Sequence, residues 1–284
     1  MRDITRIRRK VLQLAALIAV GASLAPASQA QTPNQPIAQQ PLKPMATDKN
    51  PAFEVATIKP SPPDAQGRGL SLRGHNFSAH NFTLNDLIVF AYDVQVKQIV
   101  GAPDWFVKER FDIAATPDEE GQPSPEQLKT MVQKLLADRF NLTLHHEMRE
   151  LPAFVLTVTK NGVKLKKNES GDPGPGKLNM RLTQSGMMLT TQNETMAEFA
   201  SSLQQAVVDR PVVNRTELTG RFDFQFTFAP DGSQFGGMRL PPQNDEGAAP
   251  SLFTAVQELG LKLDAVKTPV DVLVIDRAAM PSAN

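Results

Sequence analysis

The segment Asn81–Leu87, NFTLNDL, has a counterpart later in the chain at Asn193–Phe199, NETMAEF. Each begins with Asn, has Thr at its third position, and has an acidic residue three positions after that Thr. This spacing forms a capping box, which marks the start of a helix. Two further segments recur in the same order: Arg110–Ile113 returns as Arg221–Phe224, and Leu142–Leu144 returns as Leu261–Leu263. Landmarks that recur in one order predict two related halves.

Both halves combine a helical and an extended hydrophobic pattern, which predicts an α+β fold class. Leu84, Leu87, Ile88 and Ala91 follow the spacing of one buried helix face, whereas residues 222–228 alternate as in a strand. We expect each half to contain about four strands with two helices packed on a sheet.

The remaining elements can be placed from local signals. Ser124 and Pro125 suit the N-cap and first position of a second helix in the first half. The last elements of each half are expected as pairs of separate strands, at 142–145 with 154–158 and at 261–263 with 270–275.

Residues 1–30 have the features of a secretory signal peptide. Five basic residues lie near the start, an apolar stretch covers residues 11–20, and Ser28-Gln29-Ala30 fits the cleavage rule. The apolar stretch is shorter than the roughly 20 residues of a spanning helix, so we expect cleavage and no membrane span afterwards. The predicted location is the periplasm or the extracellular space, by the general or the twin-arginine route.

The balance of charge and the absence of cysteine narrow the classes of function. The whole chain has 30 basic and 30 acidic residues, and the predicted signal holds more basic than acidic ones. The mature chain is therefore acidic, which argues against a nucleic-acid partner. Without cysteine the chain has no disulfide, thiolate metal site or cysteine nucleophile.

Changes in composition predict the boundaries between segments. Residues 31–51 are rich in Gln and Pro and are expected to be a flexible tether. The first half is expected at 52–160 and the second at 179–284, with a Pro- and Gly-containing linker at 161–178 between them. Residues 229–250 have no hydrophobic period, and we expect a disordered loop there rather than a functional one.

The order of elements resembles the short N-terminal domain of secretins and TonB-linked receptors. The similar segments are Thr83–Leu87, which follows a Thr-Leu-x-x-Leu pattern, and Leu259–Leu263. This resemblance implies a small α+β domain in the cell envelope.

A second resemblance extends over almost the whole mature chain. It is carried by four segments: Phe53–Pro60, Gly101–Trp105, Leu135–Phe140 and Val272–Asp276. They resemble an uncharacterised exported family of the Solibacter type, expanded in soil Acidobacteria. Some of its members are linked to membrane metallopeptidases of the antibiotic-sensing type, which implies an envelope sensory role. The family has no catalytic residues to carry over.

The same family pattern contains Asp-Arg-Thr-Gly-Leu-x-Gly before the second Phe-Asp strand. This chain has Asn214-Arg215-Thr216-Glu217-Leu218-Thr219-Gly220, and so differs at its first and fourth positions. The geometry of the turn at these residues is therefore in question.

Familiar catalytic and metal-binding motifs are absent from the sequence. His146–Glu150 approaches the zinc-peptidase motif but ends in Glu where the second His is needed. His145 and Glu147 would share one face of a strand, and two ligands are too few for a closed site. No Gly-x-Ser-x-Gly or Ser-x-x-Lys motif occurs. We therefore predict no catalytic residue, metal or cofactor.

Three residues are candidates for contact with a ligand or partner: Trp105, Arg110 and Arg221. Trp105 is either an aromatic anchor for a glycan or peptide or a plug that closes the first core, and we favour the plug. Each Arg precedes a Phe-Asp strand, and its recurrence favours a structural pairing with a nearby acid over a ligand clamp.

These observations lead to three hypotheses of function. The first is a non-enzymatic envelope module that binds a membrane protein, an extracellular peptide or a glycan, in a groove or at a sheet edge. The second is an exported hydrolase whose carboxylates only the fold brings together. The third is an accessory subunit of a membrane sensor. Ionisable groups converging in a pocket would favour the enzyme.

Overall fold

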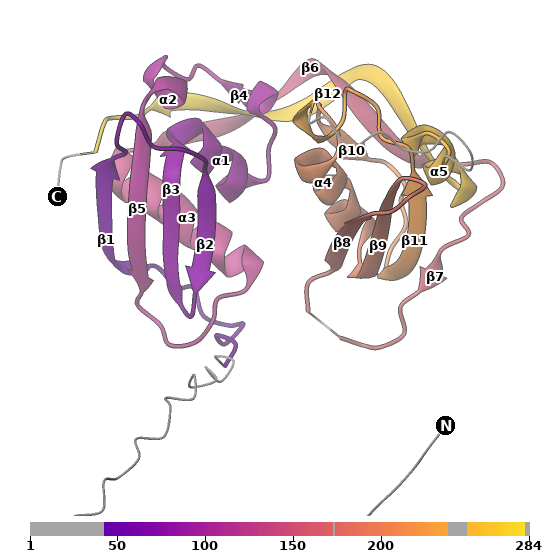
Figure 1. Ribbon diagram of the computed structural model, residues 1–284, viewed down its shortest axis with the longest axis horizontal. Coiled ribbons are helices and arrows are strands. Elements are labelled where there is room, and N and C mark those ends of the chain that lie inside the picture. The colour runs from indigo at the N-terminus through magenta and orange to yellow at the C-terminus, as the bar shows by residue number, and fades with distance from the viewer. Residues whose placement is uncertain (1–42, 173, 238–248, 282–284) are drawn as a thin grey trace, which may run out of the picture. The chain divides into compact units, whose positions relative to one another are not determined.

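The computed structural model describes residues 43–172, 174–237 and 249–281, and the expected signal peptide lies outside them. Within this part, helices and strands form three sheets of four strands each (Figure 1). The α+β class expected from the sequence is confirmed.

The first sheet has the strand order β1-β5-β3-β2 and is antiparallel throughout. Alternate residues of its strands point into one core, which is filled by two helices that begin at the predicted capping boxes of Thr83 and Ser124. The elements are β1 (Phe53–Pro60), β2 (Gly69–Arg73), β3 (Asn76–Thr83), α1 (Leu84–Tyr92), β5 (Arg110–Pro117) and α3 (Pro125–Phe140).

The second sheet has the order β7-β11-β9-β8 and is also antiparallel. Phe222, Phe224, Phe226 and Phe228 are buried on one face of β11, and the Phe199 ring of α4 meets Phe224 edge-on with centroids 5.0 Å apart. The elements are β7 (Lys166–Lys167), β8 (Lys177–Leu182), β9 (Met187–Glu194), α4 (Met196–Ala206), β11 (Phe222–Phe228) and α5 (Leu252–Glu258).

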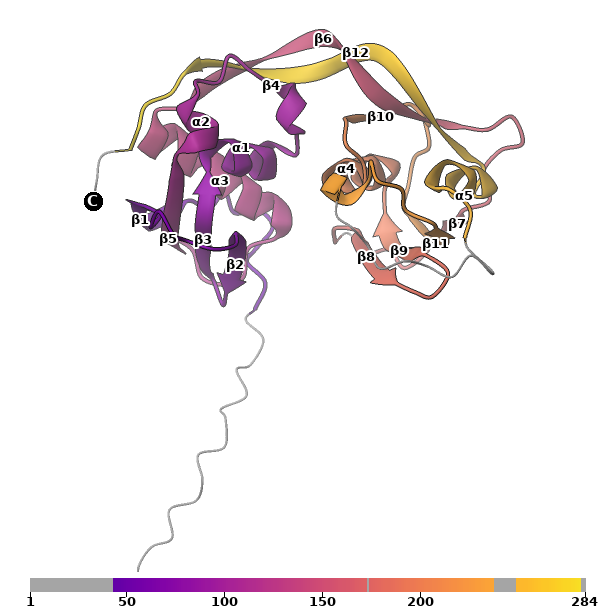
Figure 2. The same cartoon turned by 45° about the horizontal axis from the view of Figure 1, so that its top comes forward.

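The third sheet joins the two halves, in the order β10-β6-β12-β4. The strands β6 (Thr143–Val158) and β12 (Leu261–Arg277) pair antiparallel along nearly their whole length, as Figures 1 and 2 show. β4 (Ile99–Val100), from the first half, pairs parallel with β12, and β10 (Val212–Asn214), from the second half, pairs parallel with β6. Each half thus contributes a short strand to the long strand of the other.

The expectation of two separate strands at the end of each half is wrong. Residues 142–145 and 154–158 belong to the single strand β6 apart from Leu142, and 261–263 and 270–275 belong to β12. Most side chains from His145 to Pro152 are exposed, so the sequence lacks the alternation that marks a half-buried strand. The cross-strand backbone hydrogen bonds, rather than burial, continue the strand through this region.

Reciprocal glutamine side chains connect the segment after α1 to the end of α4. Gln95 Nε2 donates to the Gln204 and Val208 carbonyl oxygens, and Gln204 Nε2 donates to the Asp93 carbonyl oxygen at 2.8 Å. Gln204 is itself buried, and its Oε1 accepts from the Val212 N–H at 3.0 Å. The first residue of β10 is therefore held by the same side chain that contacts the first half.

Three short elements and the expected irregular segments complete the fold. At the end of the expected tether, Pro44 forms a bridge with Gln122 and Met45 is buried. The expected linker 161–178 contains β7 and the first residues of β8. In the expected loop 229–250, residues 238–248 lie outside the described part. The short helices are η1 (Val96–Gln98), α2 (Trp105–Lys108) and η2 (Phe235–Gly237).

The turn before β11 shows how the chain accommodates its departures from the family pattern. Asn214 Oδ1 accepts hydrogen bonds from the Thr216 N–H at 3.0 Å and the Thr216 hydroxyl at 2.8 Å, a role that Asp would fill equally. Glu217, which stands where the pattern of the resembling family has Gly, adopts a left-handed φ of 56°. A residue with a Cβ is strained in this region.

We expect Glu217→Gly to stabilise the protein by up to about 1 kcal/mol, because glycine adopts positive φ without steric cost. The change in the free energy of unfolding can be measured by urea denaturation. Glu217→Ala is the matched control, since it removes the carboxylate and keeps the Cβ. A gain with Ala as large as that with Gly would contradict the backbone explanation.

Candidate functional site

The repeated sequence motif forms the same network of hydrogen bonds in both halves. We call this network the frame; it consists of an Asn, an Asp and an Arg, which are Asn81, Asp112 and Arg110 in the first half and Asn193, Asp223 and Arg221 in the second. Asn81 and Asn193 adopt left-handed φ values of 58° and 55°, immediately before a residue pair that leads into a helix. Asn81 Nδ2 donates to the carbonyl oxygens of residues 65 and 67, and Asn193 Nδ2 donates to those of residues 172 and 174. Each Asn therefore holds two alternate carbonyls of an upstream loop.

An aspartate on the neighbouring strand completes each frame. Asp112 accepts from the Asn81 N–H at 2.9 Å, and Asp223 accepts from the Asn193 N–H at 2.7 Å. Burial works to raise the pKa of Asp112, but bonds from Ser61 and Asn81 outweigh it and lower that pKa. The two bonds from the Asn168 amide, with the Asn193 N–H, lower the pKa of Asp223. Both aspartates are thus kept ionised as structural acceptors.

The two candidate arginines belong to these frames. Arg110 Nη1 donates to the Asn81 carbonyl oxygen at 3.1 Å, and Arg221 Nη1 donates to the Asn193 carbonyl oxygen at 2.6 Å. Arg221 also forms an ion pair of 3.0 Å with Glu198, the acidic member of its capping box. Both arginines therefore contact a backbone carbonyl oxygen, and Arg221 also contacts an acidic side chain.

The other residues singled out in the sequence lie elsewhere. Trp105 begins α2, is half-buried, packs against the first core and meets Phe106 edge-on at 4.6 Å. His145 and His146 are exposed on β6, where their Nδ1 atoms lie 2.8 and 2.7 Å from carboxylate oxygens of Asp276 and Asp271. In the described part of the chain, no three His, Asp or Glu side chains are grouped to hold a metal ion.

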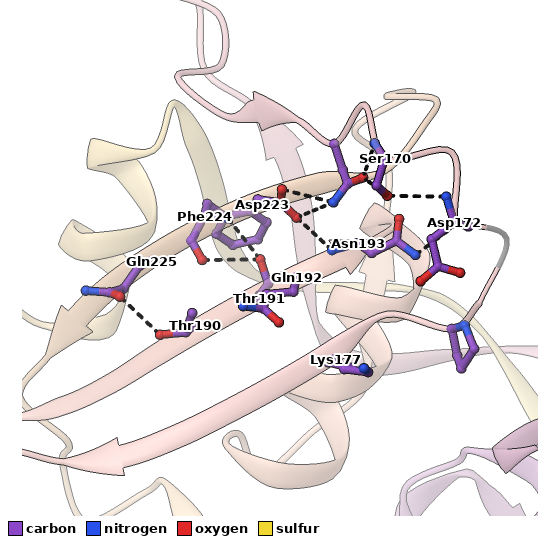
Figure 3. Close-up of a pocket in the computed structure, with 12 residues that line it drawn as sticks. Ser170, Asp172, Lys177, Thr190, Thr191, Gln192, Asn193, Asp223, Phe224 and Gln225 are labelled. Carbon is purple, nitrogen blue, oxygen red and sulfur yellow. Dashed lines mark hydrogen bonds between the residues drawn. The ribbon is translucent and has the colours of Figure 1, made fainter.

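The second half carries an open pocket of about 470 Å³ on the outer face of its sheet. Figure 3 shows its lining, which comes from β8, β9, β11 and the loop before β8. Hydroxyl and amide groups dominate it, together with two aspartates and one lysine. The lining residues are Asn168, Ser170, Asp172, Pro175, Lys177, Thr190, Thr191, Gln192, Asn193, Asp223, Phe224 and Gln225.

These polar groups lie on the pocket face because buried and more exposed side chains alternate along most of β9. Met187, Leu189 and Thr191 are buried, whereas Thr190 and Gln192 are more exposed. Thr190 Oγ1 donates to Gln225 Oε1 at 3.2 Å across the strands. The side chains of Lys177 and Gln192 have no hydrogen-bond partner among the described residues. The pocket thus offers donors and acceptors that a ligand can use.

Both carboxylates among the described residues that line the pocket already accept hydrogen bonds from the protein. Asp223 is occupied by Asn168 and Asn193, and Asp172 Oδ1 accepts from the Gly174 N–H at 2.8 Å. The candidates from the sequence, Trp105, Arg110 and Arg221, line neither this pocket nor a second cavity, which lies beside Glu194. Sequence reasoning missed the pocket because its residues form no motif and are brought together only when β8, β9, β11 and the loop before β8 fold against one another.

A buried carboxyl group was also missed. Glu194, which ends β9, is 2% exposed and lines a second cavity of about 820 Å³. Its Oε1 accepts from the Ser202 hydroxyl at 2.9 Å. Burial raises the pKa of Glu194 to about 7, against the effect of the Ser202 hydrogen bond and with the help of the Glu198 charge. When the two motifs are aligned, Glu194 occupies the position that Phe82 has in the first half. This replacement of an apolar residue by a carboxylic acid is the signal that the sequence offers.

The chain is thus an α+β protein in which the same frame occurs twice, and its second half carries a pocket lined mainly by hydroxyl and amide groups. The family model described as a protein of unknown function (DUF3738) matches residues 85–278, and the chain belongs to that family. The match begins in α1 and ends after β12, so it includes elements of all three sheets. The expectation of an uncharacterised family is therefore confirmed.

Comparison with curated proteins and with solved structures gave no match. In the part of the chain that the structure describes, no helix has the length and apolar character needed to cross a membrane.

Proposed function

We propose that this protein is a non-enzymatic binding module of the cell envelope whose pocket takes a neutral, polar ligand such as a glycan or a peptide. The observation that carries the proposal is the lining of the pocket on β8, β9 and β11. It presents hydroxyl and amide groups on rigid strands, while Asp223 is already occupied by structural hydrogen bonds.

The chemistry of these groups suits a ligand with many hydroxyl or amide groups of its own. Thr190, Gln192 and Gln225 present both donors and acceptors, and Lys177 adds one cation at the edge strand. Sugars and peptide backbones pair with such groups without the desolvation cost of a buried charge. The envelope location rests on the predicted export signal, and a membrane protein that presents the ligand fits the sensory-accessory hypothesis.

One observation favours the alternative of an exported hydrolase. Ser202 donates to Glu194 in the second cavity, and the raised pKa of Glu194 lies near the range that suits a general base at neutral pH. However, Glu198, the carboxylate beside Glu194 in this cavity, is already paired with Arg221 and held in its capping box. We therefore place binding first.

Replacing both Thr190 and Gln225 with alanine is expected to weaken binding of the pocket ligand about tenfold, because two hydrogen-bonding groups are lost. The measurement is titration calorimetry of the purified protein with neutral oligosaccharides and short uncharged peptides. The control is the Thr116→Ala, Asn76→Ala variant, which removes an equivalent exposed Thr–amide pair of 3.2 Å from the first sheet. Equal affinity of the two double variants would contradict the placement of the site.

A further inference from the structure

The edge strand β8 leaves two apolar side chains uncovered. Leu178 packs against the second core, and because side chains alternate along a strand, Met180 and Leu182 point to the same face. They are nevertheless 43% and 41% exposed. The second core therefore does not extend over the last two apolar positions of this strand.

The corresponding edge strand of the first half, β2, is covered. Phe77 of β3 pairs with Leu72. The counterpart of Phe77 in the repeat is Leu189, which pairs with Met180. Leu72 packs against the first core, whereas Met180 is exposed. An open edge is thus a property of the second half and is not required by the repeated fold.

The backbone of β8 also has hydrogen-bonding groups that face away from its sheet. β8 is the last strand in the order β7-β11-β9-β8, and β9 is its one neighbour among the described strands (Figure 1). Where the chain turns into β9, the Thr183 N–H donates to the Gly186 carbonyl oxygen at 2.8 Å. Hydrogen-bonded pairs alternate along an antiparallel ladder, so the N–H and C=O groups of Leu178, Met180 and Leu182 point outward. A further strand can pair with such groups.

The opposite face of β8 carries two cations. Lys177 and Arg181 lie four residues apart on the pocket face, with Asn179 between them. Neither cation forms an ion pair or a side-chain hydrogen bond within the described part of the chain. Pairing β8 with β8 of a second copy would bring like charges onto one face, which is unfavourable. These cations therefore favour an acidic partner over a second copy of this chain.

We propose that the edge of β8 binds an extended acidic segment of a partner protein, which joins the sheet as a further strand. The inference goes beyond the proposed function, because it concerns the sheet edge rather than the pocket and a charged partner. Side chains directly opposite each other on neighbouring strands have Cβ atoms about 5 Å apart. Acidic residues four positions apart in the segment would then face Lys177 and Arg181. Apolar residues between and beside them would face Leu178, Met180 and Leu182.

The test compares two peptides that differ only in charge, each flanked by Gly and Ser for solubility. One contains Glu-Val-Thr-Val-Glu-Val, and in the other both Glu residues are Lys. Calorimetric titration of the purified protein is expected to show saturable binding of the acidic peptide, about tenfold or more tighter than binding of the basic one. Charges on an edge strand also prevent indiscriminate pairing, and that role alone predicts that neither peptide binds. Binding of neither peptide at millimolar concentration, or equal binding of both, would overturn the proposal.

Hydrogen exchange followed by NMR shows whether the peptide joins the sheet. The amide protons of Leu178, Met180 and Leu182 are expected to exchange about tenfold or more slowly in the complex. Those of Asn179 and Arg181 face β9 and should change little. Unchanged exchange at all three outward amides would contradict strand addition, even for a peptide that binds.

Charge reversal at two equivalent positions tests the selection of an acidic partner. Arg181→Glu is expected to lower the affinity for the acidic peptide about tenfold and to raise that for the basic peptide. Arg73→Glu is the matched control, because Arg73 is exposed on β2 and its strand partner corresponds in the repeat to that of Arg181. Thr190→Ala with Gln225→Ala should leave peptide binding unchanged, so failure of the pocket and failure of the edge are distinguishable. Equal loss in the two arginine variants would overturn the assignment to β8.

Discussion

Replacing Asn193 with alanine is expected to lower the free energy of unfolding by about 2 to 4 kcal/mol. Two effects add. Alanine is strained at the left-handed φ of 55°, and the carbonyls of residues 172 and 174 lose their donor. The site is nearly buried, at 8% exposure, so water replaces the amide only in part. Urea denaturation of the variant and the parent protein measures the difference.

Glycine at the same position separates the two effects. Asn193→Gly relieves the backbone strain and still removes the side-chain hydrogen bonds, so it should recover about half of the loss. The corresponding Asn81 variants are expected to behave alike, because Asn81 has the same φ region and the same pair of carbonyl acceptors. A loss below about 0.5 kcal/mol in both alanine variants would contradict the structural role of the frame.

The second large effect concerns Glu194 and pH. Burial raises the pKa of Glu194 from 4.5 to about 7. Between these two pH values the folded protein keeps a proton on Glu194 that the unfolded chain has released. Stability should therefore be greatest below about pH 4.5 as far as this group is concerned, and should fall as pH rises through about 7. The loss is on the order of 2 to 3 kcal/mol, after which this contribution is constant.

Glu194→Gln is expected to remove this contribution, because the amide resembles the protonated carboxyl and does not titrate. The free energy of unfolding is measured for the variant and the parent at a series of pH values between 4 and 8. Other carboxylates titrate in the same range in both proteins, so the difference between the two curves isolates Glu194. A difference that is constant with pH would show that the pKa of this group is not raised.

The sequence predicted the elements whose signals are local. The capping boxes at Thr83, Ser124 and Thr195 each begin a helix, and the alternating residues 222–228 form a strand with four buried phenylalanines. These signals depend on neighbours within a few positions in the chain, so one sequence is enough to detect them.

The third sheet could not be predicted in the same way. β4 and β10 have two and three residues, and each pairs with a strand that is distant in the sequence. The exposed middle of β6 carries no alternation that would mark it as a strand. These strands form because segments that are distant in the sequence pair with one another, and a local sequence pattern does not predict such pairing.

The candidate sites show the same limit. Arg110 and Arg221 were recognised because they recur, and their contacts with the Asn carbonyls explain why they recur. Thr190, Gln192 and Gln225 have no motif, because the pocket arises only when β9 and β11 align. Glu194 was visible in the repeat as the counterpart of Phe82, but its burial required the fold.

We propose that this protein binds a polar ligand and releases it chemically unchanged. The most direct measurement is incubation of the purified protein with the neutral oligosaccharide and peptide panel, with calorimetry for binding and mass spectrometry for the ligand afterwards. We predict saturable binding of at least one probe, weakened by Thr190→Ala with Gln225→Ala, and recovery of that probe intact. Cleavage of a probe that is abolished in Glu194→Gln would contradict the claim and favour a hydrolase.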